Sequence, residues 1–208
     1  MVLLLTKGAF MRKLVAIEFL SVDGVMQGLG SYDEDREGGF EHGGWGAPYA
    51  EAIHATVGSS GADDTSAYLF GRKTYEKMAA FWPHQPDTNP IAASMNAAEK
   101  FVVTTTRDQF EWDNSRRIAG DVVDGVRAMK ADGEGIVAML GSGVLARSLL
   151  AEGVIDSLRL FIHPLLLGSG KRLFGDLGRP CDLTLTNCES TPLGSVILTY
   201  DITAGLSE

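Results

Sequence analysis

Short apolar runs alternate with amphipathic segments along most of the chain. Five runs are predominantly apolar and rich in Val, Ile, Leu and Phe, as expected of strands buried on both faces. They lie at residues 14–20, 67–70, 100–105, 136–140 and 157–163. The segments between them have apolar residues at helical spacing or helix-start and helix-stop residues. These predict helices at 48–57, 72–81, 121–131 and 144–152, and therefore an α/β domain with a largely parallel sheet.

The last two apolar runs have a different pattern. Residues 183–188 and 195–202 alternate apolar and polar positions, and no helical segment separates them. This is typical of an antiparallel pair at one edge of the sheet. Segments 84–90 and 106–120 are interpreted as polar connections.

The connection after the first strand is a glycine-rich loop at residues 21–46. Loops of this length in a compact domain are usually functional. Its acidic residues, Asp33, Glu34, Asp35 and Glu37, are interpreted as a solvated face of that loop.

Composition narrows the functional classes. The chain has 208 residues and a formal net charge of -9, which argues against a nucleic-acid or anionic-membrane surface. No apolar run approaches the roughly 18 residues of a membrane span, so a cytoplasmic protein is expected. Cys181 and Cys188 fit no metal signature and are expected to be reduced thiols. Residues 1–10 are interpreted as an N-terminal extension, with Met11 as a second candidate start, and residues 11–204 as one domain.

Three strand ends carry residues suited to a phosphorylated ligand. Gly71-Arg72-Lys73-Thr74 opens a helix with two cations, although a helix N-terminus favours anions. Thr104, Thr105 and Arg107 follow the next strand. Gly141-Ser142-Gly143-Val144 opens a further helix, with glycines that allow close backbone approach. Because such loops meet at the carboxyl ends of the strands, we expect a dinucleotide site there.

The residues favour NADP over NAD. The Gly141–Gly143 loop has no third glycine at the fingerprint position, and no acidic residue follows a second strand to bind a ribose hydroxyl. Arg72, Lys73 and Arg107 are available instead, as a 2′-phosphate requires.

The order of motifs resembles the dihydrofolate-reductase-like superfamily. Gly-Arg-x-Thr at 71–74 and the strand at 100–105 carry the general resemblance. Four further segments are similar to the C-terminal reductase domain of the riboflavin-biosynthesis deaminase–reductase. They are 20–24 (LSVDG), 140–145 (LGSGVL), 153–156 (GVID) and 162–168 (IHPLLLG).

The resemblance implies a three-layer fold with a mostly parallel central sheet and an antiparallel C-terminal strand pair. It also implies NADPH binding, hydride transfer to a small heterocyclic or ribosylated substrate, and a homodimer. By this resemblance the cofactor positions are Arg72, Thr74, Thr104, Thr105 and 141–144, and Ser21 and Asp23 lie near the nicotinamide and substrate. Gly71, Lys73 and Arg107 are added to the cofactor site from the residues themselves. Trp45-Gly-Ala-Pro48 resembles the Trp-x-x-Pro of dihydrofolate reductases, which precedes their substrate carboxylate; here Ala50 occupies that position and Glu51 follows it.

Asp23, Glu51 and His54 are the candidate proton donors, with Asp23 and Glu51 preferred as catalytic residues. Trp45 and Tyr49 are candidates to stack on a flat substrate, and His163 is interpreted as structural. No metal site is expected. Two other functions stay open: a non-catalytic NADP(H)- or nucleotide-binding protein, and a pterin or flavin reductase of the dihydrofolate reductase type.

Overall fold

The apolar runs form one eight-stranded sheet in the computed structural model, which describes residues 11–57, 65–86, 88–175, 177–178 and 180–203. The strand order is β4-β3-β2-β5-β1-β6-β8-β7. The first six strands are parallel, β8 runs antiparallel to β6, and β7 runs antiparallel to β8. The strands are β1 (Lys13–Ser21), β2 (Thr65–Gly71), β3 (Glu99–Val103), β4 (Ser115–Ile118), β5 (Ile136–Leu140), β6 (Ser157–His163), β7 (Asp182–Ser190) and β8 (Val196–Thr203). The predicted mixed sheet with an antiparallel C-terminal pair is confirmed.

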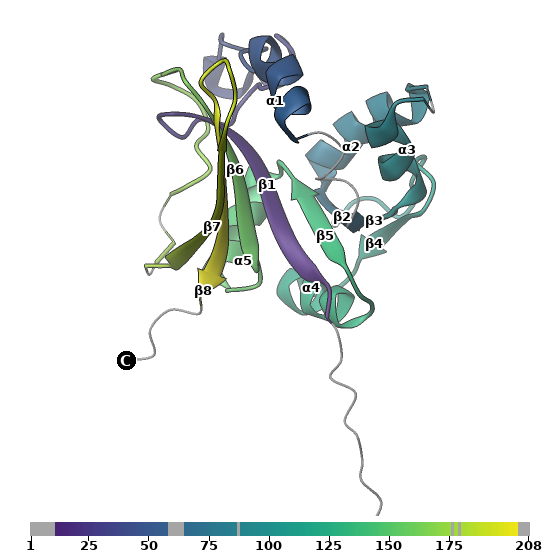
Figure 1. Cartoon of the computed structure of the whole chain (residues 1–208). Helices are drawn as coiled ribbons and strands as arrows, with labels where there is room; N and C mark the ends of the chain where they lie inside the picture. Colours follow the sequence, from purple (N-terminus) through teal and green to yellow (C-terminus); the bar gives the residue numbers. More distant parts are fainter. Residues whose placement is uncertain (1–10, 58–64, 87, 176, 179, 204–208) are drawn as a thin grey trace, which may run out of the picture.

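Helices cover both faces of this sheet and complete three layers (Figure 1). The helices are α1 (Ala50–Val57), α2 (Arg72–Phe81), α3 (Pro90–Ala97), α4 (Val122–Ala131) and α5 (Gly143–Ala151). Single 3-10 turns occur at Glu37–Gly39, Ala47–Tyr49 and Trp82–His84. One apolar core joins α4 and α5 to the middle of the sheet. On the other face, α2 and α3 pack over β2 and β3, and α1 packs over β1 and β6. None of the helices in the described ranges could span a membrane.

Two elements were not predicted, and one begins later than predicted. α3 is capped by Asn89, whose side chain accepts hydrogen bonds from the amides of Ile91 and Ala92, with Pro90 in the first helical position. β4 is an edge strand with two exposed arginines, so it lacks the apolar run that marks a buried strand. α1 begins at Ala50 because Pro48 lies in a preceding 3-10 turn.

Glu18 is a buried carboxyl in the middle of β1. Its side chain is 1% exposed, and Oε1 has no hydrogen-bond partner among the described residues. Burial raises the pKa of Glu18 well above its usual value. The folded protein therefore holds a proton that the unfolded chain releases above about pH 4.5, and it loses stability as the pH rises.

Replacing Glu18 with glutamine is expected to stabilise the protein at neutral pH. Glutamine fills the same volume without the cost of keeping a carboxyl protonated. Urea unfolding at pH 5 and at pH 8 should give a higher free energy of unfolding for the variant than for the wild type, and the difference should be larger at pH 8. Glu41→Gln, at an exposed position, is the control and should show no such trend. Parallel stability curves for Glu18→Gln and the wild type would contradict this assignment.

Candidate functional site

The N-termini of α2 and α5 lie side by side at the carboxyl edge of the sheet. The amide of Gly71 donates a hydrogen bond to Ser142 Oγ at 2.9 Å, joining the two turns across neighbouring strands. A Cβ placed on Gly141 would lie 3.8 Å from Thr74 Cγ2. Neither helix has a side-chain cap, so the first amides of both are available to an anion. The first and third predicted loops therefore lie together.

The third strand end lies at the same edge. Gly71 pairs with Val103 in the register of β2 and β3, so Thr104 and Thr105 follow directly beside the α2 turn. Thr104 is buried and its hydroxyl accepts a hydrogen bond from the amide of Thr106 at 3.2 Å. Residues 106–111, which include Arg107, line an open depression of about 540 Å³. The three loops predicted to hold a dinucleotide thus share one edge of the sheet.

The two cations of the α2 turn each have a carboxylate partner. Arg72 Nη1 lies 3.1 and 3.0 Å from the two carboxylate oxygens of Glu76, one helical turn further along α2. Lys73 Nζ lies 3.4 Å from Glu37 Oε2. Both pairs are solvent-exposed, and exposed pairs contribute only about 0–1 kcal/mol. A phosphate can therefore replace these carboxylates at little cost.

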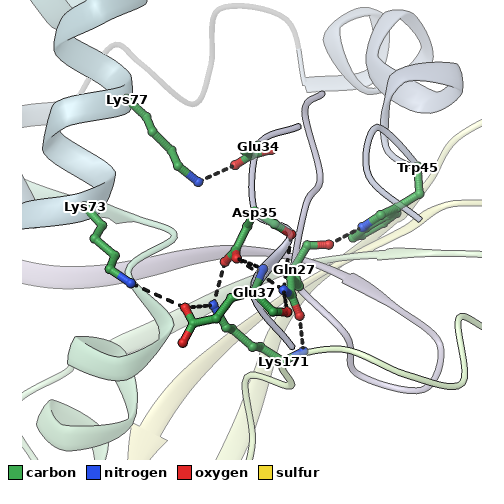
Figure 2. Close-up of polar contacts among 8 residues, drawn as sticks. All are labelled: Gln27, Glu34, Asp35, Glu37, Trp45, Lys73, Lys77 and Lys171. Atoms are coloured by element: carbon green, nitrogen blue, oxygen red, sulfur yellow. Dashed lines mark hydrogen bonds and ion pairs between the residues drawn. The ribbon is translucent and has the colours of Figure 1, made fainter. Parts of the chain in front are cut away.

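The glycine-rich loop is held by ion pairs on two sides (Figure 2). Lys171 Nζ lies 2.7 Å from Asp35 and 2.7 Å from Glu37, and Lys77 Nζ lies 3.6 Å from Glu34. Hydrogen bonds from Lys171 and Lys73 lower the pKa of Glu37. The interpretation of this acidic run as a solvated face holds for Glu37, which is exposed, whereas Glu34 and Asp35 are half-buried. All three carboxylates join the loop to α2 or to the segment before β7.

Gln27 and Trp45 extend the same network into the loop. Gln27 Oε1 accepts a hydrogen bond from the amide of Lys171, and its Nε2 donates to Asp35 and to the carbonyl of Glu37. Trp45 Nε1 donates to the carbonyl of Gln27 at 2.7 Å. Met26 lies against α5, since a Cβ on Gly143 would overlap its sulfur. The loop therefore reaches both helix N-termini.

Asp23 joins two loops through hydrogen bonds. Its carboxylate accepts hydrogen bonds from Ser21 Oγ at 2.6 Å and from the amides of Leu167 and Gly168 at 3.1 and 2.8 Å. These hydrogen bonds hold the pKa of Asp23 well below the usual range, and the bond from Ser21 has the largest effect. A carboxylate held ionised in this way has no proton to donate at neutral pH. The geometry thus argues against Asp23 as proton donor, and Ser21 is engaged with it.

The other predicted substrate-side residues lie around α1. Glu51 and His54 are exposed on that helix. Tyr49 stacks on the ring of His163 with centroids 4.6 Å apart, and Trp45 meets the same ring edge-on at 5.6 Å. Trp45 and Tyr49 are therefore brought together, with His163 between them. A histidine directly before Pro164 at a strand end was the one sequence feature that pointed to this position.

Stability is expected to depend on pH through His163. The ring is 2% exposed, Nδ1 lies 2.9 Å from Ser195 Oγ, and Nε2 is buried without a partner among the described residues. Burial lowers its pKa to about 4. The unfolded chain binds this proton below about pH 6.5, so the stabilising contribution is complete above that pH and is lost as the pH falls toward 4.

We expect the wild type to lose about 3 kcal/mol of unfolding free energy between pH 6.5 and pH 4 through this ring. His163→Asn should remove that slope, while His84→Asn, on the surface loop, should keep it. Unfolding titrations at several pH values measure the difference. Equal slopes in the two variants would show that His163 does not titrate in this window.

Comparison with known proteins agrees with this architecture. Residues 12–198 match the family of the RibD C-terminal domain. The uncharacterized protein YyaP of Bacillus subtilis is 27% identical over 136 residues, which cover 64% of this chain and 71% of that protein.

Two solved structures share the fold at low sequence identity. One, from Shewanella sp. PV-4 and named for riboflavin biosynthesis, has a TM-score of 0.67 at 19% identity and covers 92% of this chain and 99% of its own. The other is dihydrofolate reductase from Enterococcus faecalis in complex with NADP(H), with a TM-score of 0.54 at 16% identity and coverage of 94% and 99%. The sheet therefore has the dihydrofolate-reductase-like fold, and the chain belongs to the RibD C-terminal reductase family.

Proposed function

We propose that this protein is an NADPH-dependent reductase that transfers a hydride to a small heterocyclic or ribosylated substrate. The observation that carries the proposal is the hydrogen bond between Gly71 and Ser142, which holds two uncapped helix N-termini together. Such a pair offers several amide donors to a pyrophosphate. Arg72, Lys73 and Arg107 lie on the same edge and provide the charge that a 2′-phosphate needs.

The residues present suit this cofactor. NADPH, when bound, supplies the hydride, and the protein's part is to position the acceptor and exclude water. In our proposal Gly71–Thr74 and Gly141–Val144 bind the phosphates, and Thr104 and Thr105 lie beside the adenosine half. The loop at residues 21–46 closes the site, because it already contacts α2 and α5.

For the substrate, we propose a uracil-type compound of the kind reduced in riboflavin biosynthesis, such as 5-amino-6-(5-phosphoribosylamino)uracil. Family membership supports this class. Trp45 and Tyr49 would flank the substrate, and Glu51 or a water molecule would supply the proton. We also propose that the protein is a homodimer in the cytoplasm.

A non-catalytic nucleotide-binding protein is the second candidate. It is favoured by one observation: Asp23 is held ionised by its hydrogen bonds, while Glu51 is exposed on α1. Neither carboxylate is then placed as a proton donor, as a protein that binds the nucleotide without turnover allows.

Turnover separates the two functions. We expect NADPH absorbance at 340 nm to fall when the protein is mixed with aminopyrimidinedione ribosides or their phosphates. Dihydropterins and flavins, assayed in the same way, test the dihydrofolate-reductase-type alternative. Saturable NADPH binding without oxidation by any of these compounds would favour the binding protein over the reductase.

A further inference from the structure

Arg159 is a guanidinium on the sheet that has no carboxylate partner among the described residues. It lies on β6, between Ile17 of β1 and Thr199 of β8 in register. The side chain is half-buried, and its Nε is buried with no hydrogen-bond partner among the described residues. No carboxylate in the described ranges lies within ion-pair distance of it. Desolvating Nε without a hydrogen-bond acceptor is costly, and the contact with the Phe161 ring does not satisfy this donor.

The guanidinium faces the α1 side of the sheet. Its carbon lies 5.5 Å from the ring centroid of Phe161, two residues along the same strand. Phe161 packs with Ile53 of α1, whereas Leu158 and Leu160 face the opposite core. The negative charge of Glu189 acts on Arg159 without an ion pair, and Glu189 Oε1 accepts a hydrogen bond from Asn187. Arg159 thus retains free donors on the face that α1 covers.

Arg159 is also next to the residue that connects this face to the candidate cofactor loop. Ile17 is half-buried and packs against both the α1 cluster and the α2–α3 cluster. Its carbonyl accepts a hydrogen bond from the amide of Gly141 at 3.3 Å. Neighbouring strands are about 4.8 Å apart, so a ring over Ile17 comes within reach of Arg159.

We propose that Arg159 binds the oxygen-bearing edge of the reducible substrate and so sets the specificity of the site. This rests on the proposed reductase function. A guanidinium offers paired N–H donors in a fixed plane, which suits two carbonyl oxygens or an oxyanion. It repels a protonated ring and leaves amino groups without an acceptor. The site therefore accepts a pyrimidinedione and rejects an aminopyrimidine that has amino groups in place of the carbonyl oxygens.

Calorimetric titration with two probes tests this in the presence of saturating NADPH. 5,6-Diaminouracil carries the carbonyl edge, and 2,4,6-triaminopyrimidine carries amino groups in its place. The wild type should bind the first at least tenfold more tightly. Arg159→Met should raise the dissociation constant for 5,6-diaminouracil by about 10- to 100-fold, as expected for loss of charge-assisted hydrogen bonds. The affinity for NADPH should not change.

Arg127→Met, at an exposed position on α4, is the matched control and should bind both probes as the wild type does. Arg159→Met should also melt at the same temperature as the wild type or higher, because it removes a half-buried cation whose Nε has no acceptor among the described residues. A lower melting temperature would indicate a structural role and overturn the proposal.

The remaining outcomes are also decisive. Unchanged binding of 5,6-diaminouracil to Arg159→Met, equal affinity of the wild type for the two probes, or no binding of either probe would each overturn the role of Arg159. If the wild type does not bind NADPH, the proposed reductase function fails first, and the two failures are distinguishable.

Discussion

Replacing Arg72 with alanine is expected to raise the dissociation constant for NADPH by about 10- to 100-fold and that for NADH by less than about threefold. The residue begins α2 beside the Gly141–Gly143 loop, and in the described part of the chain its ion-pair partner is Glu76 on the same helix. A 2′-phosphate would exchange this exposed ion pair for a charge-assisted, bidentate contact. NADH lacks that phosphate, so its dissociation constant should hardly change in the Arg72→Ala variant.

Two further variants sharpen this experiment. Glu76→Gln frees Arg72 from its carboxylate and should leave NADPH affinity equal or higher. Lys77→Ala removes a cation from the same helix that pairs with Glu34, and it should have a small effect. Fluorescence titration of each variant with both dinucleotides gives the constants. Equal losses of NADPH and NADH affinity in Arg72→Ala would mean that Arg72 does not read the 2′-phosphate.

Replacing Lys100 with methionine is expected to lower the free energy of unfolding by about 3 kcal/mol or more. The side chain is fully buried, and Nζ donates 2.9 Å hydrogen bonds to the carbonyls of Met95, Asn96 and Ala98. It also lies 4.5 Å from the ring centroid of Trp112. Lys100 thus satisfies the C-terminal carbonyls of α3, which methionine would leave buried without a donor.

Urea unfolding followed by tryptophan fluorescence measures this effect, because the Trp112 ring contacts Lys100. Lys13→Met, at an exposed position on β1, is the control and should change the unfolding free energy by less than about 0.5 kcal/mol. A loss below about 1 kcal/mol in Lys100→Met would show that water or a local rearrangement satisfies the α3 carbonyls instead.

Much of the fold could be predicted from periodicity. Continuous apolar runs identified the central strands, since each is buried on both faces. The edge strand β4 was missed because its Ser-Arg-Arg-Ile sequence is mostly exposed. α3 was missed because its Ala- and Ser-rich sequence follows a Pro- and Asn-rich loop, although Asn89-Pro90 is a recognisable helix start.

The candidate site was predictable only where it consists of local motifs. Helix-opening glycines and the basic residues beside them are short-range patterns, and topology brings them to one edge. The contacts that close the loop are different, because Lys171 pairs with Asp35 and Glu37 across more than 130 residues. No local pattern distinguishes such carboxylates from solvated ones. The same applies to Arg159, because only the placement of its neighbours shows that its Nε has no acceptor in the described part of the chain.

Titration of the wild-type protein with NADPH and with NADH tests the central claim most directly. Our account predicts saturable binding of NADPH, seen as quenching of tryptophan fluorescence, with an affinity at least tenfold higher than that for NADH. Absence of saturable NADPH binding, or equal affinity for the two dinucleotides, would contradict the assignment of the paired α2 and α5 N-termini as an NADPH site.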